Sequence, residues 1–217
     1  MDKKSDVSGI IEAGIGRLKY LMDAGIREVP FPSKKNRLNE IHGEISACER
    51  CPLCRQRKNA VFGAGNPDAK VLFVGGVPSK EDDLAGGPFT GSAGEQLTKI
   101  IKSMGLERKD VYITNVVKCR PSGDRIPTPE EFSLCVTHLE GEIDVIGPRV
   151  IISLGGDSTG ALLGCVGGAA EMRGRFHLYR GIKLMPTHPP GLLLEKPELK
   201  KDTWHDIQMV IKELKGP

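Results

Sequence analysis

Hydrophobic positions along the chain form short apolar runs separated by segments with helical spacing. Four runs have the length of buried strands: VLFVGG (71–76), VYITNVV (111–117), VIISLGG (150–156) and the second arm of a hairpin within 176–186. Helical spacing follows the first three runs, and an amphipathic helix is predicted over 197–214. Apolar strands that alternate with helices predict an α/β fold, with three αβα layers around a central, mostly parallel four-stranded sheet.

The first 40 residues have a different pattern and are predicted to form an appendage. Ile10, Ile11, Ile15 and Leu18 fall near helical spacing, and REVPFPSKK (27–35) then interrupts it. We therefore expect an N-terminal helical extension over 1–40, packed on a main domain over 41–217.

Glycines and an amide gather where the predicted strands end. Gly75 and Gly76 end the first run, Asn115 lies near the end of the second, and a loop follows Met185. In open α/β sheets, ligands bind beyond the carboxyl ends of the strands. The sequence therefore predicts a ligand site at this edge. It also raises the question of why a buried strand carries an amide at Asn115 and, four residues later, a thiol at Cys119.

Composition narrows the class of protein. The chain has 217 residues, 39% of them hydrophobic, which is enough for one core, and a net charge of +3 that neither requires nor excludes a nucleic-acid partner. The opening MDKKSDVSG lacks the apolar run of a signal peptide, and no stretch approaches the roughly 20 apolar residues of a membrane span. We expect a cytoplasmic monomer with no membrane partner, in a compartment where structural disulfides are rare.

The cysteines therefore point to metal chemistry. Cys48, Cys51 and Cys54 lie in CERCPLC, while Cys119 and Cys135 lie far along the chain. A C-x2-C pair presents two thiolates to one metal from a tight turn, which suits zinc or an iron–sulfur cluster. No second C-x2-C pair completes a zinc ribbon, and the wide spacing of the last two favours a cluster. Zinc and unligated buried cysteines remain the alternatives, and Cys54 is a competing ligand.

From about residue 45 to 212 the chain resembles the iron–sulfur (family-4-type) uracil-DNA glycosylases. The matching segments, in order, are CERCPLC, GGPFTGSAGEQL, VYITNVVKCRPSGDRIPTPEE, PRVIISLGG and KPELKKDTWHDI. The resemblance implies the fold of that superfamily. It also implies that a [4Fe-4S] cluster is held by Cys48, Cys51, Cys119 and Cys135.

The same resemblance gives roles to the strand-end residues. Asn115 would lie in a pocket for a base flipped out of DNA, where its amide pairs with O4 and N3–H of uracil. Cytosine presents an amino group and a bare N3 there, which leaves polar groups unpaired at about 1–3 kcal/mol each. Phe89 matches the aromatic residue on which the base stacks, and Gly76 and Val77 belong to the base-binding loop. A strand-capping asparagine and a core phenylalanine are the simpler interpretations.

Two segments depart from the family pattern. The family's G-E-A-P-G reads Gly-Gly-Val-Pro-Ser here, so Gly76 replaces the acidic residue, and Asp82 or its neighbour Asp83 is the candidate catalytic carboxylate. In PTHPPGLLLEKPE, an ungapped register puts His188 one position early and Pro189 in the place of the family's histidine. A gapped register restores His188 and Pro189 to the family positions but requires compensating insertions nearby. His188 is the candidate catalytic donor to O2 of the departing base, a contact worth about 2.7–4 kcal/mol.

Candidate DNA contacts flank these segments. Lys118, Arg120 and Arg125 lie around the cysteine loop and could face phosphates, although each is also typical of a solvated surface charge. Leu193, within a run of three leucines, is the candidate wedge that fills the gap left by a flipped base; packing on the final helix is the alternative.

Together these features favour a monofunctional DNA glycosylase that excises uracil or another deaminated base from DNA by hydrolysis of the N-glycosidic bond. No residue marks itself as a covalent nucleophile, so strand cleavage is not expected. The rival hypothesis is a member of the superfamily that binds damaged or single-stranded DNA with weak or lost activity. The changes at Gly76 and His188 favour the rival, and Asn115 with Phe89 favours the enzyme.

Overall fold

The structure is a computed structural model that describes residues 15–17, 19–25, 32–164 and 169–216. The chain divides into two compact units, 1–33 and 34–217. In the first unit, the described residues from 15 to 23 are helical. The boundary predicted at residue 40 falls inside helix α2 (Lys34–Ser46), which packs against helix α5 (Pro129–Ile146) of the same unit. Much of the predicted N-terminal helix, and the sixth cysteine, Cys165, lie outside the described residues.

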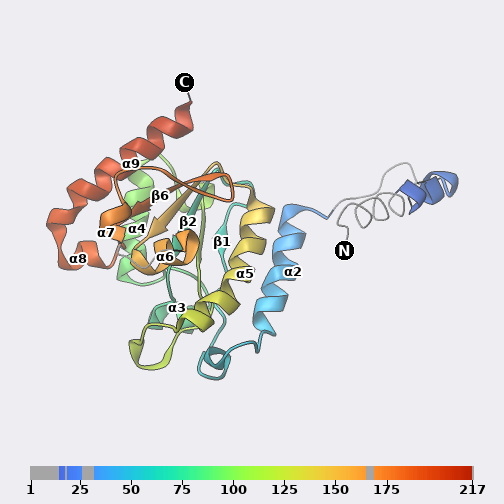
Figure 1. The fold of residues 1–217 in the computed structure, drawn as a ribbon, viewed down its shortest axis with the longest axis horizontal. Coiled ribbons are helices and arrows are strands. Elements are labelled where there is room, and N and C mark those ends of the chain that lie inside the picture. The colour runs from blue at the N-terminus through green and yellow to red at the C-terminus, as the bar shows by residue number, and fades with distance from the viewer. Residues whose placement is uncertain (1–14, 18, 26–31, 165–168, 217) are drawn as a thin grey trace. The chain divides into compact units, whose positions relative to one another are not determined.

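A six-stranded sheet forms the centre of the second unit, with the strand order β1-β3-β2-β4-β6-β5 (Figure 1). Its four inner strands are mutually parallel. They are β2 (Val71–Gly75), β3 (Tyr112–Asn115), β4 (Val150–Leu154) and β6 (Ile182–Thr187). The edge strands β1 (Ala64–Gly65) and β5 (His177–Tyr179) pair antiparallel with β3 and β6. The prediction of an α/β fold with a mostly parallel sheet is confirmed.

The predicted number of four strands is wrong for the whole sheet. It counts the parallel strands, whose residues are apolar and largely buried, and omits the two edges. Strand β1 has only two residues, both exposed, and β5 has three that are half-buried or exposed. Such short strands bury one face weakly or not at all, so they leave little hydrophobic pattern in the sequence.

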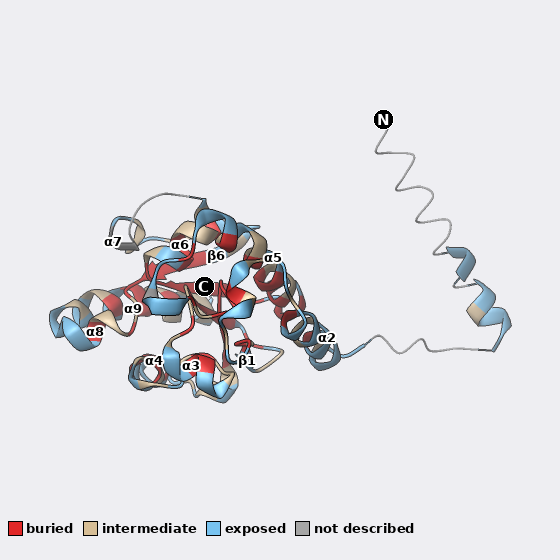
Figure 2. Cartoon of the chain, turned by 90° about the horizontal axis from the view of Figure 1, so that it is seen from below, coloured by how far each residue is buried: buried red, intermediate tan, exposed pale blue. Residues whose placement is uncertain are grey.

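Helices cover both faces of the sheet, and alternation along each strand divides the core in two. In β2, Val71 and Phe73 pack toward one face, and Leu72 and Val74 toward the other. The first face is covered by α4 (Ser92–Ser103), α8 (Leu192–Glu195) and α9 (Lys200–Lys215), and the second by α2, α5 and α6 (Gly156–Leu163). The short helix α7 (Ala169–Met172) contacts α6 and β6. Figure 2 shows the buried residues gathered between these layers. Among the described helices, none has the length and apolar character needed to cross a membrane.

The connections contain the remaining short helices. These are α3 (Lys80–Ala85) and the 3-10 turns η1 (Pro52–Arg55), η2 (Arg108–Asp110), η3 (Ser122–Asp124) and η4 (Pro197–Leu199). Helix α5 begins where Thr128 and Glu131 cap each other: the Thr128 hydroxyl accepts from the Glu131 amide, and the Glu131 carboxylate accepts from the Thr128 amide.

A buried ion pair ties the end of β3 to α5. The ammonium group of Lys118, 1% exposed, donates to Glu142 Oε2 at 2.6 Å, to the Thr114 hydroxyl at 2.6 Å and to the Asn115 carbonyl at 2.8 Å. The other oxygen of Glu142 accepts from the Gly63 amide at 3.1 Å. Because both groups are buried, removal of either one would leave the other without its counter-charge.

Substitution of Lys118 by Met should lower the free energy of unfolding by about 3–5 kcal/mol, because it leaves the Glu142 carboxylate buried without a counter-charge. The matched control is Lys109→Met, since Lys109 pairs with Glu107 on the surface and such pairs contribute about 0–1 kcal/mol. Urea denaturation under anaerobic conditions measures both. Equal stability of the two variants would show that the buried pair does not fasten β3 to α5.

Candidate active site

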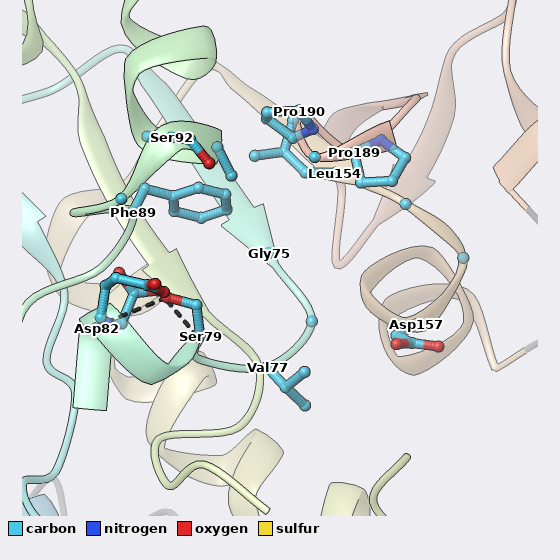
Figure 3. A pocket seen from close by; sticks show the side chains of 18 residues that line it. Gly75, Val77, Ser79, Asp82, Phe89, Ser92, Leu154, Asp157, Pro189 and Pro190 are labelled. Atoms are coloured by element: carbon cyan, nitrogen blue, oxygen red, sulfur yellow. Dashed lines mark hydrogen bonds between the residues drawn. The ribbon is translucent and has the colours of Figure 1, made fainter. Parts of the chain in front are cut away.

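A cavity of about 380 Å³ lies beyond the carboxyl ends of the parallel strands (Figure 3). Three of its walls are the segments that end or follow β2, β4 and β6, and the fourth is the loop that leads into α4. We call it the strand-end cavity. Its lining residues are Gly75, Gly76, Val77, Ser79, Glu81, Asp82, Phe89, Gly91, Ser92, Ala93, Gly94, Leu154, Gly155, Gly156, Asp157, Pro189, Pro190 and Gly191. This is the edge at which the sequence predicts a ligand site.

Gly75 brings Asn115 and Phe89 together at this cavity. Asn115 is paired with Gly75 across β2 and β3 and is 1% exposed. A Cβ atom on Gly75 would lie 2.2 Å from Asn115 Oδ1 and 2.7 Å from Phe89 Cζ. Any side chain at position 75 would therefore occupy the space in which the amide and the ring meet. Asn115 lies directly behind a glycine that lines the cavity.

The amide of Asn115 has no internal partner. Both Nδ2 and Oδ1 are buried, and neither makes a hydrogen bond with any described residue. Buried polar groups are nearly always paired, and an unpaired one costs about 1–3 kcal/mol. An orphaned donor and acceptor side by side, next to a cavity, are the feature expected of a group that a ligand satisfies.

The backbone of Phe89 is held in an unfavourable conformation. Its φ angle is 54°, in the left-handed region that few side chains adopt. On one side Asp82 fixes the next residue, since its Oδ1 accepts from the Thr90 amide at 2.7 Å and from the Thr90 hydroxyl at 2.8 Å. Its Oδ2 accepts from the Ser79 amide at 3.1 Å, which caps α3. Asp82 therefore ties the Phe89 loop to α3.

Arg108 fixes the other side of the same loop. Its guanidinium donates to the Pro88 carbonyl at 3.2 Å and to the Gly94 carbonyl at 3.3 Å. A Cβ atom on Gly94 would lie 1.8 Å from the Phe89 carbonyl oxygen, so the loop closes on α4 only over a glycine. Backbone strain of this kind persists where the surroundings over-determine it, often at functional sites. The sequence did not single out Arg108, because it lies among other charged residues in the segment after α4.

In the structure, Asp82 holds the neighbouring backbone in place through hydrogen bonds. It lines the cavity, yet it is 4% exposed and both oxygens accept hydrogen bonds from Ser79 and Thr90. Its neighbour Asp83 accepts from the backbone amides of Lys58 and Asn59. Both carboxylates are therefore engaged in hydrogen bonds within the protein.

His188 lies outside the cavity lining, and Pro189 lies in it. His188 is 7% exposed, and its Nε2 is 3.7 Å from the Asp202 carboxylate. Pro189 packs against Gly155, whose φ of 101° turns the chain after β4: a Cβ atom there would lie 3.2 Å from the proline ring. Of these two residues, the proline and not the histidine borders the cavity.

The remaining base-site candidates, Gly76 and Val77, both line the cavity. Asp157 also lines it, from the N-terminus of α6, although the sequence interpretation missed it. The available signal was its position: an acid directly after the two glycines that end the third apolar run.

The candidate DNA contacts have different environments. Lys118 is buried and paired with Glu142, so its charge is not presented at the surface. Arg125 forms two bonds of 2.7 Å to Glu131, and Arg120 is half-buried. Leu193 is 1% exposed and packs between α4 and α9, which contradicts its expected role as a wedge.

A second cavity gathers the cysteines. Cys48, Cys51, Cys54, Cys119 and Cys135 all line it, although CERCPLC and the last two are far apart in the sequence. No three His, Cys, Asp or Glu side chains in the described part of the chain stand close enough together for a single metal ion. The cysteines thus surround a shared volume without converging on one point.

Cationic and N–H donors face the sulfurs of that cavity. Arg50 donates to Cys48 Sγ at 3.5 Å, Arg57 donates to Cys119 Sγ at 3.1 Å, and the Lys118 amide donates to Cys135 Sγ at 3.3 Å.

Burial opposes thiolate formation at these cysteines, and the donors favour it. Burial raises the pKa of Cys135 to about 11, and it also raises the pKa of Cys119 against the opposing effect of Arg57. At Cys48, burial is outweighed by Arg50 and Arg57 together, so the pKa is lowered. Buried thiols with N–H donors and guanidinium groups suit an anionic sulfur-ligated centre, because the donors offset charge that burial penalises.

Comparison with known proteins identifies the family. The model of the uracil DNA glycosylase superfamily matches residues 62–208. The chain belongs to the uracil-DNA glycosylase superfamily. Among curated relatives, the type-4 uracil-DNA glycosylase of Sulfurisphaera tokodaii is 38% identical over 80% of this chain and 83% of its own length. Those of Pyrobaculum aerophilum and Thermotoga maritima are each 40% identical, over 79% and 80% of this chain and 92% and 93% of their own.

In this superfamily member, Gly75→Ala should lower the free energy of unfolding by about 1–3 kcal/mol, because the added methyl group collides with Asn115 and Phe89 in a packed interior. Gly87→Ala is the matched control in the Phe89 loop, since its Cβ would lie 3.7 Å from its nearest neighbour, Thr90 Cγ2. Thermal unfolding compares the two. A Gly75→Ala variant as stable as the control would mean that the amide and ring have room to separate.

Proposed function

We propose that this protein is a uracil-DNA glycosylase, which hydrolyses the N-glycosidic bond of uracil in DNA in base excision repair. Membership of the superfamily and identity to type-4 uracil-DNA glycosylases support the activity. The observation that carries the proposal is the unpaired amide of Asn115 behind Gly75, with the Phe89 ring beside it.

Asn115 reads the base in this proposal. Its Nδ2 donates to O4 of a flipped uracil and its Oδ1 accepts from N3–H, which satisfies both orphaned atoms at once. Cytosine offers a donor where uracil has O4 and an acceptor where uracil has N3–H, so like groups would face each other. At about 1–3 kcal/mol for each unpaired buried group, two mismatches suffice to exclude cytosine.

Phe89 supplies the stacking surface. Its ring borders the cavity at Gly75 and is held there through Thr90 and Arg108 contacts on either side. Base–aromatic stacking contributes about 1–3 kcal/mol and does not depend on the identity of the base. Stacking therefore favours entry of any flipped base, and the amide provides the selection.

The departing base carries negative charge, and the loop 188–191 faces it in this proposal. Pro189 and Pro190 have no N–H to donate. His188 can serve as the donor to O2 only after the loop moves, because its Nε2 faces Asp202 in the free protein. This arrangement is the observation that favours the second candidate function, a protein that binds damaged DNA with weak excision.

DNA contacts are proposed on the same side. Arg120 and Arg125, on the loop after Cys119, would contact phosphates, and Gly76 and Val77 would border the base. Leu194, 44% exposed, replaces the buried Leu193 as the proposed wedge into the duplex.

The proposal includes a [4Fe-4S] cluster held by Cys48, Cys51, Cys119 and Cys135. Their shared cavity and the N–H donors to three of the sulfurs support it. When bound, the cluster supplies a covalent tie between distant segments. Arg57 helps to offset its charge and also fixes the chain by donating to the Ser46 carbonyl at 2.6 Å.

Anaerobically purified protein should contain about four iron and four sulfide per chain. Cys119→Ser should lose most of the iron, whereas Cys54→Ser, which alters the fifth thiol of the same cavity, should keep it. Metal analysis and the visible absorption spectrum measure the difference. Zinc in place of iron, or equal loss in the two variants, would contradict the assignment.

The function is tested with duplexes that contain uracil, hypoxanthine or xanthine. Wild-type protein should release uracil and leave alkali-labile abasic sites. Asn115→Leu, which keeps the shape but removes both hydrogen-bonding groups, should slow uracil release about tenfold or more, since each lost bond is worth about 1–3 kcal/mol.

The same variant has a distinctive effect on stability. Because the Asn115 amide has no partner among the described residues of the free protein, leucine removes a buried polar group that lacks hydrogen bonds. The midpoint of thermal unfolding should therefore stay the same or rise.

Two outcomes would contradict the proposal. If wild-type protein in excess binds DNA but releases no base, the result favours the second candidate function, the DNA-binding protein. Slow release together with a lower midpoint in Asn115→Leu would indicate a structural asparagine.

A further inference from the structure

The proposed reaction needs a carboxylate that the loop after β2 does not supply. Cleavage of the N-glycosidic bond develops positive charge at C1′ of the sugar and requires a water molecule there. Gly76 has no side chain, and both oxygens of Asp82 are engaged by Ser79 and Thr90. A group from another element must perform this task if the protein is an enzyme.

Asp157 occupies the space that a side chain at position 76 would fill. A Cβ atom on Gly76 would lie 2.8 Å from the Cβ atom of Asp157 and 3.4 Å from its Oδ2. The two positions belong to different strand ends, since Gly76 follows β2 and Asp157 lies two residues after Gly155, beyond β4. Asp157 lies on the first turn of α6, and Figure 3 shows it near the loop that carries Gly75 and Val77.

The carboxylate of Asp157 has no structural task in the described part of the chain. It does not cap α6, whose N-cap is Gly155. The hydroxyls of Ser158 and Thr159, not Asp157, bond the Gly155 carbonyl, at 3.1 and 2.8 Å. Asp157 is exposed within the cavity lining, so its carboxylate remains hydrated and available.

The third carboxylate of the cavity, Glu81, is placed differently. Its stem lies against Gly91, where a Cβ atom would be 3.3 Å from Glu81 Cγ. Glu81 therefore lies by the loop that leads into α4, away from the position that residue 76 faces. It serves as the matched control: an exposed acid of the same cavity without the contact to Gly76.

We propose that Asp157 is the catalytic carboxylate of this protein and takes over, from α6, the task of an acid at position 76. The inference rests on the proposed function. As the C1′–N1 bond breaks, its electron pair leaves with the uracil, and the oxygen of a water held by Asp157 bonds to C1′. Asp157 accepts the proton of that water and returns it to solvent, and the uracil anion is protonated from solvent. The products are free uracil and an abasic sugar, with one water consumed.

The proposal links two residues that the sequence presents separately. A side chain at position 76 and the carboxylate of Asp157 exclude each other, because their Cβ atoms would be 2.8 Å apart. The glycine at position 76 therefore makes room for the Asp157 side chain. In this proposal the acid has moved from position 76 to position 157 and has not been lost. Moving the acid back to position 76 should work only when residue 157 is made small.

The test measures single-turnover release of uracil by the full-length, cluster-loaded protein. Asp157→Asn should slow release about 10²-fold or more without weakening DNA binding, in the range typical of a lost general base. Glu81→Gln, which changes another acid of the same cavity, should slow release far less than Asp157→Asn. Asp157→Gly should be equally slow, and activity should return with added formate or in the double variant Gly76→Asp/Asp157→Gly.

The outcomes separate the two proposals. A wild-type protein that releases no uracil overturns the proposed function and this inference with it. An active wild type with an equally active Asp157→Asn variant overturns the inference alone. Loss in Asp157→Asn with no recovery by formate or by the relocated acid assigns Asp157 a structural role and also overturns it.

Discussion

The candidate site is organised around one buried polar group, the side-chain amide of Asn115. It lies at the end of β3, behind Gly75. Among the described residues, neither polar atom of this amide has a hydrogen-bond partner, which costs about 1–3 kcal/mol for each atom until a ligand satisfies it. Everything around the amide limits its alternatives. Gly75 leaves the space open, Phe89 closes it from the side, and Lys118 holds the Asn115 carbonyl so that the strand end cannot turn away.

The segment from Asn115 to Cys119 joins the two candidate sites and explains why an amide at a strand end and a thiol in the following loop lie so close in the sequence. Asn115 lies behind Gly75, which lines the strand-end cavity, and Cys119 lines the cysteine cavity. Between them Lys118 is buried against Glu142, and its amide bonds Cys135. A cluster bound at the cysteines would therefore fix the far end of the segment that carries the Asn115 amide.

Much of the fold and part of the site could be predicted from the sequence. Apolar runs specify the parallel strands because those strands are buried on both faces. The end of a strand singles out Asn115, and the C-x2-C spacing singles out a cysteine pair, whereas the roles of Phe89 and of the four cysteine ligands come from the family resemblance. The edge strands were missed because they bury little. Lys118 was misplaced because a lone basic residue in a loop gives no sign of a buried partner 24 residues away. Asp157 was missed because the sequence does not show that it lies close to Gly76. The two residues follow different strands, β4 and β2, and meet only in the folded sheet.

The most direct test of the central claim is a crystal structure of the protein with a duplex that carries a 2′-fluorinated deoxyuridine, which resists excision. The account predicts a flipped uracil in the strand-end cavity, stacked on Phe89, with O4 and N3 within hydrogen-bond distance of the two polar atoms of the Asn115 amide. A base bound elsewhere, or an Asn115 amide that turns to pair with another protein group while uracil occupies the cavity, would contradict it.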